Sequence, residues 1–89
     1  MLVAKLPIVN KLGLHARAAS VFVKTASAYA SEITVTNPIK SANGKSIMSM
    51  MMLQASFGSE IEVTVEGDDE QEAMAAITSI VENRFGEAE

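Results

Sequence analysis

The segment EIEVTVEG, residues 60–67, constrains the fold of this chain more than any other stretch. Its apolar side chains recur at every second position, at Ile61, Val63 and Val65, and acids or threonine occupy the positions between them. A period of two is typical of a β-strand with one buried and one solvated face. Such a strand needs partner strands beside it and an apolar layer over its buried face.

Three other segments are predicted to be strands. Residues 2–8 alternate in the same way, and Pro7 places this strand at a sheet edge because proline cannot donate to a neighbouring strand. The segment EITVTN, residues 32–37, alternates as well, and the turn dipeptides Asn37-Pro38 and Asn43-Gly44 enclose a short third strand at residues 39–42.

Three helices are predicted to supply the covering layer. Small and apolar residues at helical spacing indicate a first helix over residues 16–28. Ser46 is a good N-cap for a short methionine-rich helix that ends before Gly58. Asp68 and Asp69 precede a final helix, for which Asp69 and Glu72 have the spacing of a capping box and Gly86 is a stop. Its expected buried stripe is Ala73, Ile77, Ile80 and Val81.

The predicted order is therefore β-α-β-β-α-β-α in one domain, residues 1–89. The expected fold class is α+β: an open-faced two-layer β-sandwich, with a four-stranded antiparallel sheet and three helices on one face. A chain of 89 residues buries only about 60–65% of its unfolded surface, so a shallow surface site is expected.

The composition excludes several kinds of site. There is no cysteine, which rules out disulfides and thiolate chemistry, and a single histidine makes a zinc site improbable. No cofactor or metal is expected. No apolar run is long enough to span a bilayer, and the first residues do not resemble a signal peptide, so we expect a cytoplasmic protein.

The net charge of −4 is divided unevenly. Residues 1–59 carry a net charge of +5 and residues 60–89 a net charge of −9. The acidic part argues against nucleic acid as a partner. Solvated charged faces would explain the division, and so would a mildly basic surface that meets an acidic partner protein.

His15 is the one histidine, and it lies in NKLGLHARAAS, residues 10–20. A single histidine is more often a packed structural residue than a functional one. Its place between a glycine-containing loop and the first turn of a predicted helix favours function here. The N–H groups of Ala16 and Arg17 lack helical acceptors there, and a helix N-terminus together with an arginine is suited to phosphate. These residues fit a phosphorylated histidine. A nucleotide-binding loop is absent, because the glycine that a Walker A motif ending in residues 44–46 would need at position 39 is Ile39.

With those residues in view, the chain resembles the HPr family, the histidine phosphocarriers of the phosphoenolpyruvate-dependent phosphotransferase system. The resemblance rests on GLHAR at 13–17, KSIMSMMML at 45–53 and GDDEQEA at 67–73. It implies that His15 accepts a phosphoryl group on Nδ1 from enzyme I and passes it to an enzyme IIA domain, with Arg17 as its electrostatic partner. It also implies a carrier rather than a turnover enzyme. Two positions depart from the family pattern: Ala18 stands where the family usually has proline, and Gln54 where it often has glycine.

The methionine-rich segment has more apolar side chains than one buried stripe can use. If Ile47, Met50 and Leu53 pack inward, Met48 and either Met51 or Met52 face solvent. Such a patch suits a surface that accepts several partners, although flexible core filling is the alternative. The resemblance implies docking of enzyme I and IIA domains here and on the first helix; the expected partner-binding residues are Ala16, Ser20, Lys24, Ile47, Met48, Met51 and Met52. It further implies that Ser46 is a regulatory phosphorylation site for an HPr kinase/phosphorylase.

Two alternatives stay open. The segment NKLGLHARAA is also similar to the nitrogen-related paralogue, NPr, so the chain could serve nitrogen regulation instead of sugar uptake. A non-catalytic regulatory module that binds through the methionine patch and is switched at Ser46 is the competing class. In every case we expect a monomer.

Overall fold

Strand β4 (Glu60–Glu66), the segment with the clearest alternation, lies inside the sheet. The computed structural model describes residues 1–89 and has a four-stranded antiparallel sheet in the order β1-β4-β2-β3. Strand β1 spans Leu2–Pro7, β2 spans Glu32–Thr36 and β3 spans Ser41–Asn43. As Pro7 predicts, β1 is an edge strand, paired only with β4.

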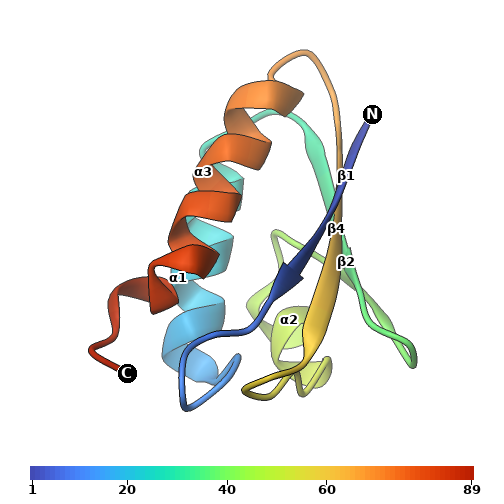
Figure 1. Ribbon diagram of the computed structural model, residues 1–89. Helices are drawn as coiled ribbons and strands as arrows, with labels where there is room; N and C mark the ends of the chain where they lie inside the picture. The colour runs from blue at the N-terminus through green and yellow to red at the C-terminus, as the bar shows by residue number, and fades with distance from the viewer.

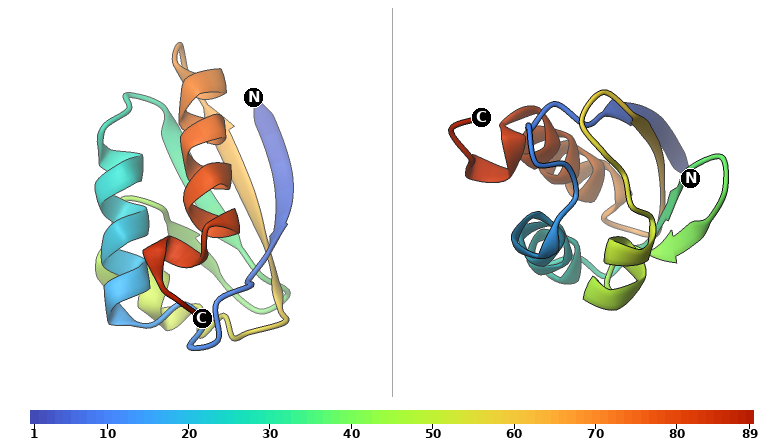
Figure 2. Two further views of the ribbon diagram at one scale, coloured as in Figure 1. Left: turned by 60° about the vertical axis from the view of Figure 1, so that its left-hand side comes forward. Right: turned by 90° about the horizontal axis from the view of Figure 1, so that it is seen from below.

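The helices α1 (Ala16–Ser27), α2 (Ile47–Met52) and α3 (Glu70–Glu82) lie on one side of the sheet (Figure 1 and Figure 2). Ile61, Val63 and Val65 of β4 are fully buried beneath them, whereas the alternate side chains of β4 are exposed or half-buried. One hydrophobic cluster joins the sheet to all three helices. The predicted α+β open-faced sandwich is confirmed.

Some local expectations differ from the structure. The third strand begins at Ser41 because the Asn37 side chain accepts hydrogen bonds from the N–H groups of Ile39 and Lys40, which holds those residues in a turn. The first helix ends at Ser27, one residue before the predicted end. Ile80 is only half-buried, and α3 ends at Glu82, before the expected stop at Gly86, which instead ends a 3₁₀ turn, η1 (Arg84–Gly86).

The expected capping box at the start of α3 is wrong. Asp69 occupies the N-cap position, but its side chain makes no cap hydrogen bond and instead accepts from Ala30 and Ser31 ahead of β2. Glu70, rather than Glu72, accepts from the N–H of Gly67 at 3.2 Å. A tertiary contact has replaced the local one.

Candidate functional site

The loop before α1 presents His15 at the surface. Gly13 adopts φ +70°, a left-handed conformation that favours glycine, and a Cβ there would lie 2.7 Å from the carbonyl oxygen of Ala55. The next residue, Leu14, is buried and its N–H donates to that same oxygen at 2.8 Å. Leu14 therefore anchors the loop in the core, and His15 follows as the N-cap of α1 with 29% of its side chain exposed.

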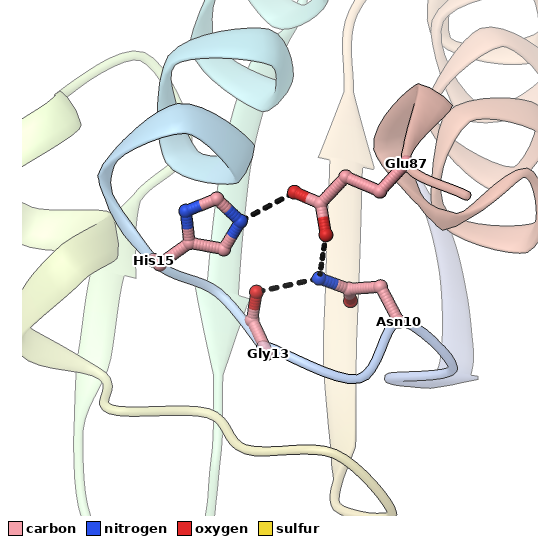
Figure 3. Close-up of polar contacts among 4 residues, drawn as sticks. All are labelled: Asn10, Gly13, His15 and Glu87. Carbon is pink, nitrogen blue, oxygen red and sulfur yellow. Dashed lines mark hydrogen bonds and ion pairs between the residues drawn. The ribbon is translucent and has the colours of Figure 1, made fainter. Parts of the chain in front are cut away.

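His15 is held by a carboxylate from the far end of the chain. Its Nε2 atom contacts Oε2 of Glu87, and the other carboxylate oxygen, Oε1, accepts a hydrogen bond from Nδ2 of Asn10 at 3.0 Å. Nδ2 of Asn10 also donates to the carbonyl oxygen of Gly13 at 2.7 Å (Figure 3). The ring, the carboxylate and the loop thus form one connected set of polar contacts.

The surroundings of the Glu87 carboxyl group favour its charged form. Desolvation by burial acts to raise its pKa, but the hydrogen bonds from Asn10 and His15 and the positive charges of His15 and Arg17 outweigh it, so the pKa lies below the ordinary value. Glu87 is therefore a carboxylate at neutral pH, able only to accept hydrogen bonds.

Glu87 reaches His15 because the backbone reverses sharply after α3. Arg84 and Phe85 have φ of 56° and 54°, and Gly86 has φ 80°. Two successive non-glycine residues in the left-handed region are costly, by roughly 1–2 kcal/mol each. Burial of the Phe85 side chain offsets this cost. The N–H of Lys11 then donates to the carbonyl oxygen of Glu89, which ties the last residues to the loop before His15.

The Nδ1 atom of His15 has no partner. It forms no hydrogen bond or ion pair, and Figure 3 shows it on the side of the ring that faces away from Glu87. The first N–H of α1 that finds an acceptor is that of Ala19, which donates to the carbonyl oxygen of His15, so the N–H groups of Ala16 and Arg17 remain free. The N–H of Ala18 also has no acceptor in the helix, so the proline that is usual in the family at this position would break no helical hydrogen bond.

Arg17 is exposed and makes no ion pair. Its side chain lines an open hollow of about 590 Å³ together with Leu12, His15, Ala16 and Glu87. A shallow surface site was expected for a chain of this size, and the hollow has that form. A free imidazole nitrogen, two free N–H groups and an unpaired guanidinium are the components that a phosphoryl group requires.

Ser46 is the N-cap of α2, as predicted: its hydroxyl accepts a hydrogen bond from the N–H of Ser49 at 3.3 Å. The neighbouring Lys45 donates to the carbonyl oxygen of Tyr29, just beyond the end of α1, whereas His15 caps the opposite end of that helix. No hydrogen bond or ion pair joins Ser46 to His15 or Arg17. The structure therefore does not bring Ser46 into the histidine site.

The expected docking residues are all at the surface or close to it. Ala16, Ser20 and Lys24 of α1 are exposed. In α2, Met50 is fully buried and Met48 is 72% exposed. Of the side chains considered for the buried stripe, Ile47 is 41% exposed and so lies at the surface with the expected docking residues, whereas Met50, Leu53 and Ala55 fill the core beneath α2. We call the exposed apolar side chains of α2 the α2 patch: Ile47, Met48, Met51 and Met52.

Sequence reasoning missed two residues of the site, Asn10 and Glu87. Asn10 lies in the segment NKLGLHARAAS, but nothing in the local pattern indicates that its amide turns inward and is fully buried. Glu87 gave no indication at all, because it is 72 residues from His15 in the sequence. A hydrogen bond between such distant residues leaves no periodicity to detect.

Comparison with known proteins adds the family. The family model described as the PTS HPr component phosphorylation site matches residues 3–83. The phosphocarrier protein HPr of Neisseria meningitidis serogroup A is 51% identical over 89 residues, covering all of both chains. That of Pseudomonas aeruginosa is 45% identical over 86 residues, 96% of each chain.

The chain belongs to the HPr family of phosphocarrier proteins. The resemblance drawn from GLHAR and the two other segments is confirmed, and with it the link to the phosphotransferase system. The crystal structure of HPr-C-His from Thermoanaerobacter tengcongensis superposes with a TM-score of 0.95 at 45% identity and full coverage of both chains.

Some HPr-family structures are dimers. An HPr dimer from Thermoanaerobacter tengcongensis matches with a TM-score of 0.78 at 46% identity, covering 98% of this chain and all of that one. Crh of Bacillus subtilis, described as a swapped dimer, matches with a TM-score of 0.75 at 36% identity, covering 94% and 97%. The monomer expected for this chain stays a prediction. None of its helices is long and apolar enough to cross a membrane.

Proposed function

We propose that this HPr-family protein accepts a phosphoryl group from phosphorylated enzyme I on Nδ1 of His15 and passes it to an enzyme IIA domain. The observation that carries the proposal is the free Nδ1 atom at the N-terminus of α1, with the N–H groups of Ala16 and Arg17 also free. His15 is the phosphoryl acceptor and Arg17 its electrostatic partner.

The transfer needs little from the protein beyond position and charge. The Nδ1 lone pair forms a bond to phosphorus while the bond from phosphorus to the donor atom breaks, and that electron pair returns to the donor. Phosphoryl oxygens meet the free N–H groups and the guanidinium of Arg17, which makes no competing ion pair. Because the site is an open hollow, donor and acceptor proteins can each approach it directly.

Docking to both partners is assigned to α1 and the α2 patch. Ala16, Ser20 and Lys24 of α1 are exposed, and α1 contacts α2, which carries the α2 patch. Methionine is flexible and adapts to more than one partner surface. The net positive charge of residues 1–59 suits an acidic partner.

Ser46 is assigned as a regulatory phosphorylation site for an HPr kinase/phosphorylase. A phosphate on Ser46 would add negative charge beside the α2 patch. Since Ser46 lies outside the histidine site, the added charge would weaken docking rather than disturb His15.

Sugar uptake and nitrogen regulation use the same phosphocarrier chemistry, and we assign the chain to the sugar branch with the nitrogen branch as the alternative. We further propose that residues 1–89 form one domain and that the protein is a monomer in the cytoplasm. The single hydrophobic cluster supports the one-domain assignment.

The test is intact mass after incubation with phosphoenolpyruvate and an enzyme I from either branch. Wild-type protein is expected to gain one acid-labile phosphoryl group, and His15→Ala none. Arg17→Ala is expected to gain it at least about 10-fold more slowly. If the wild type gains nothing with enzyme I of both branches, or if His15→Ala gains the group as well, the proposal is overturned. The enzyme I that reacts faster identifies the branch.

A further inference from the structure

Asn10 is the most completely buried polar side chain near the site. It is 0% exposed, its two N–H bonds are both used, and its Oδ1 atom is buried without a partner. A buried amide with an unsatisfied oxygen is unfavourable, so its retention calls for a reason. The two atoms that its Nδ2 contacts are the carbonyl oxygen of Gly13 and Oε1 of Glu87.

The Asn10 amide matches the two acceptors on either side of it. Both are oxygens without a proton to give, so the group between them must supply two donors. The reversed orientation of the Asn10 amide would direct its oxygen at both acceptors, so the contacts fix the orientation. An aspartate would place a second carboxylate against Glu87. The Asn10 amide thus determines which way the Glu87 carboxylate points.

The Glu87 carboxylate in turn determines the state of the imidazole. Its Oε2 atom faces Nε2 of His15 and can only accept, so the proton of the neutral ring belongs on Nε2. A neutral imidazole has one protonated and one unprotonated nitrogen, and a hydrogen bond at one nitrogen decides the state of the other. The lone pair is then on Nδ1, the nitrogen without a partner.

From these contacts we infer that Asn10 and Glu87 are positioning residues that hold His15 in its Nε2–H tautomer and so make Nδ1 the nucleophile. The tautomer assignment depends only on the contacts among Asn10, Glu87 and His15. Its consequence for phosphoryl transfer rests on the proposed function. After transfer the ring carries a positive charge, and its Nε2–H faces the carboxylate, which stabilises it.

The backbone around Glu87 supports a dedicated role. Left-handed conformations at Arg84 and Phe85 bring Glu87 into contact with His15, and strain of this kind collects at functional sites. Glu87 also lies beyond residues 3–83, the part of the chain that the family model matches.

Glu87→Gln tests the inference because it should reverse the tautomer. Asn10 would still donate to the carbonyl oxygen of the substituted side chain, which turns the amide N–H of that side chain toward Nε2 of His15. Nε2 would then have to accept, and the proton would move to Nδ1, where it blocks attack. Asn10→Asp is the second variant: it releases Glu87, and both tautomers are expected. Glu82→Gln is the matched control, since Glu82 is exposed on α3, makes no ion pair and lies outside the hollow around His15.

The first readout is ¹⁵N NMR of the His15 ring, followed as the pH is raised until the shifts of both ring nitrogens no longer change, so that the neutral ring is observed. The protonated and unprotonated ring nitrogens have well separated shifts. We expect the Nε2–H form in the wild type and in Glu82→Gln, and the Nδ1–H form in Glu87→Gln. A proton on Nδ1 in the wild type, or the same tautomer in wild type and Glu87→Gln, would overturn the inference.

The second readout is chemical phosphorylation by phosphoramidate, which requires no enzyme I. The Nδ1 lone pair bonds to phosphorus, the phosphorus–nitrogen bond of the zwitterionic reagent breaks, and ammonia leaves with the electron pair. Modification of Nδ1 is expected to be at least about 10-fold slower in Glu87→Gln and unchanged in Glu82→Gln. Equal rates in all three proteins would contradict a positioning role.

The two readouts also separate this inference from the proposed function. A wild type that shows the expected tautomers but takes no phosphoryl group from enzyme I retains the inference and loses the proposed function. A wild type that accepts the group while Glu87→Gln matches it in tautomer and rate retains the function and loses the inference.

Discussion

Asp69, at the start of α3, accepts hydrogen bonds from the N–H groups of Ala30 and Ser31, 2.8 and 2.9 Å away, just ahead of β2. The Ser31 hydroxyl donates to the same carboxylate, and Ser31 itself is buried. The contact joins two segments 38 residues apart. It holds the end of the α1–β2 connection against the β4–α3 turn.

This contact predicts a loss of stability in acid. The side-chain hydrogen bond from Ser31 is the largest cause that lowers the pKa of Asp69 below its usual 3.8, followed by the N–H of Ala30. A lowered carboxyl pKa contributes stability that is present above the unfolded-state pKa and is lost as pH falls through the folded-state value. The unfolding free energy should therefore fall as pH drops below about 3.8.

Asp69→Asn checks this in urea unfolding series between neutral and acid pH. The variant should be less stable at neutral pH, and its stability should fall less steeply in acid. Some acid dependence will persist, because the pKa values of Glu70 and Glu87 are lowered as well. Equal acid slopes for wild type and Asp69→Asn would contradict the prediction.

Gln54→Gly should stabilise the protein. Gln54 follows the C-cap of α2 with φ 53°, a position that strongly prefers glycine, and it is exposed, so its side chain contributes little packing. Removing the Cβ relieves the left-handed strain, and we expect about 0.5–1 kcal/mol of added stability after the backbone entropy of glycine is subtracted. Gln54→Ala is the control, since alanine keeps the strain and should show no gain in urea unfolding.

Gly13→Ala should destabilise the protein and displace His15. An added Cβ would meet the carbonyl oxygen of Ala55 at 2.7 Å, a backbone atom that also accepts from Leu14 and cannot move freely. We expect a loss of about 3 kcal/mol or more. Gly58→Ala is the matched control: φ is also positive, at +87°, but no atom lies within 4 Å of the added Cβ.

Gly58→Ala should therefore lose only the left-handed cost, about 1–2 kcal/mol. Thermal or urea unfolding of both variants gives the difference, which measures the clash in the loop before His15. If Gly13→Ala is as stable as Gly58→Ala, the loop before His15 accommodates the added Cβ without a clash, and the prediction is wrong.

Substitutions at Ser46 should separate its structural role from its charge. Ser46→Ala removes the acceptor for the N–H of Ser49 and should cost about 1 kcal/mol. Asn and Asp are both good N-caps, so Ser46→Asn and Ser46→Asp should retain stability. Only Ser46→Asp, with its negative charge beside the α2 patch, should slow phosphoryl transfer from enzyme I. If Ser46→Asn slows transfer equally, the charge is not the cause.

Several features of this protein are determined locally and can be predicted from the sequence. Alternation at Ile61, Val63 and Val65 predicted a half-buried strand because successive side chains of a strand face opposite sides. Ser46 was predicted as an N-cap because its hydroxyl satisfies an N–H only three residues away. The residues around His15 predicted its position just before a helix. GLHAR and two further segments indicated the family of the protein.

Contacts between distant segments were decided only by the tertiary structure. Asp69 has the spacing for a local cap, yet two N–H groups and a hydroxyl near Ser31 compete successfully for its carboxylate. Ile47 fits a buried position by periodicity, but Met50 and Leu53 already fill the core under α2. Glu87 meets His15 only because the backbone reverses after α3. Hydrogen bonds and packing of this kind depend on which segments the fold brings together. The local sequence around each residue does not determine those long-range contacts.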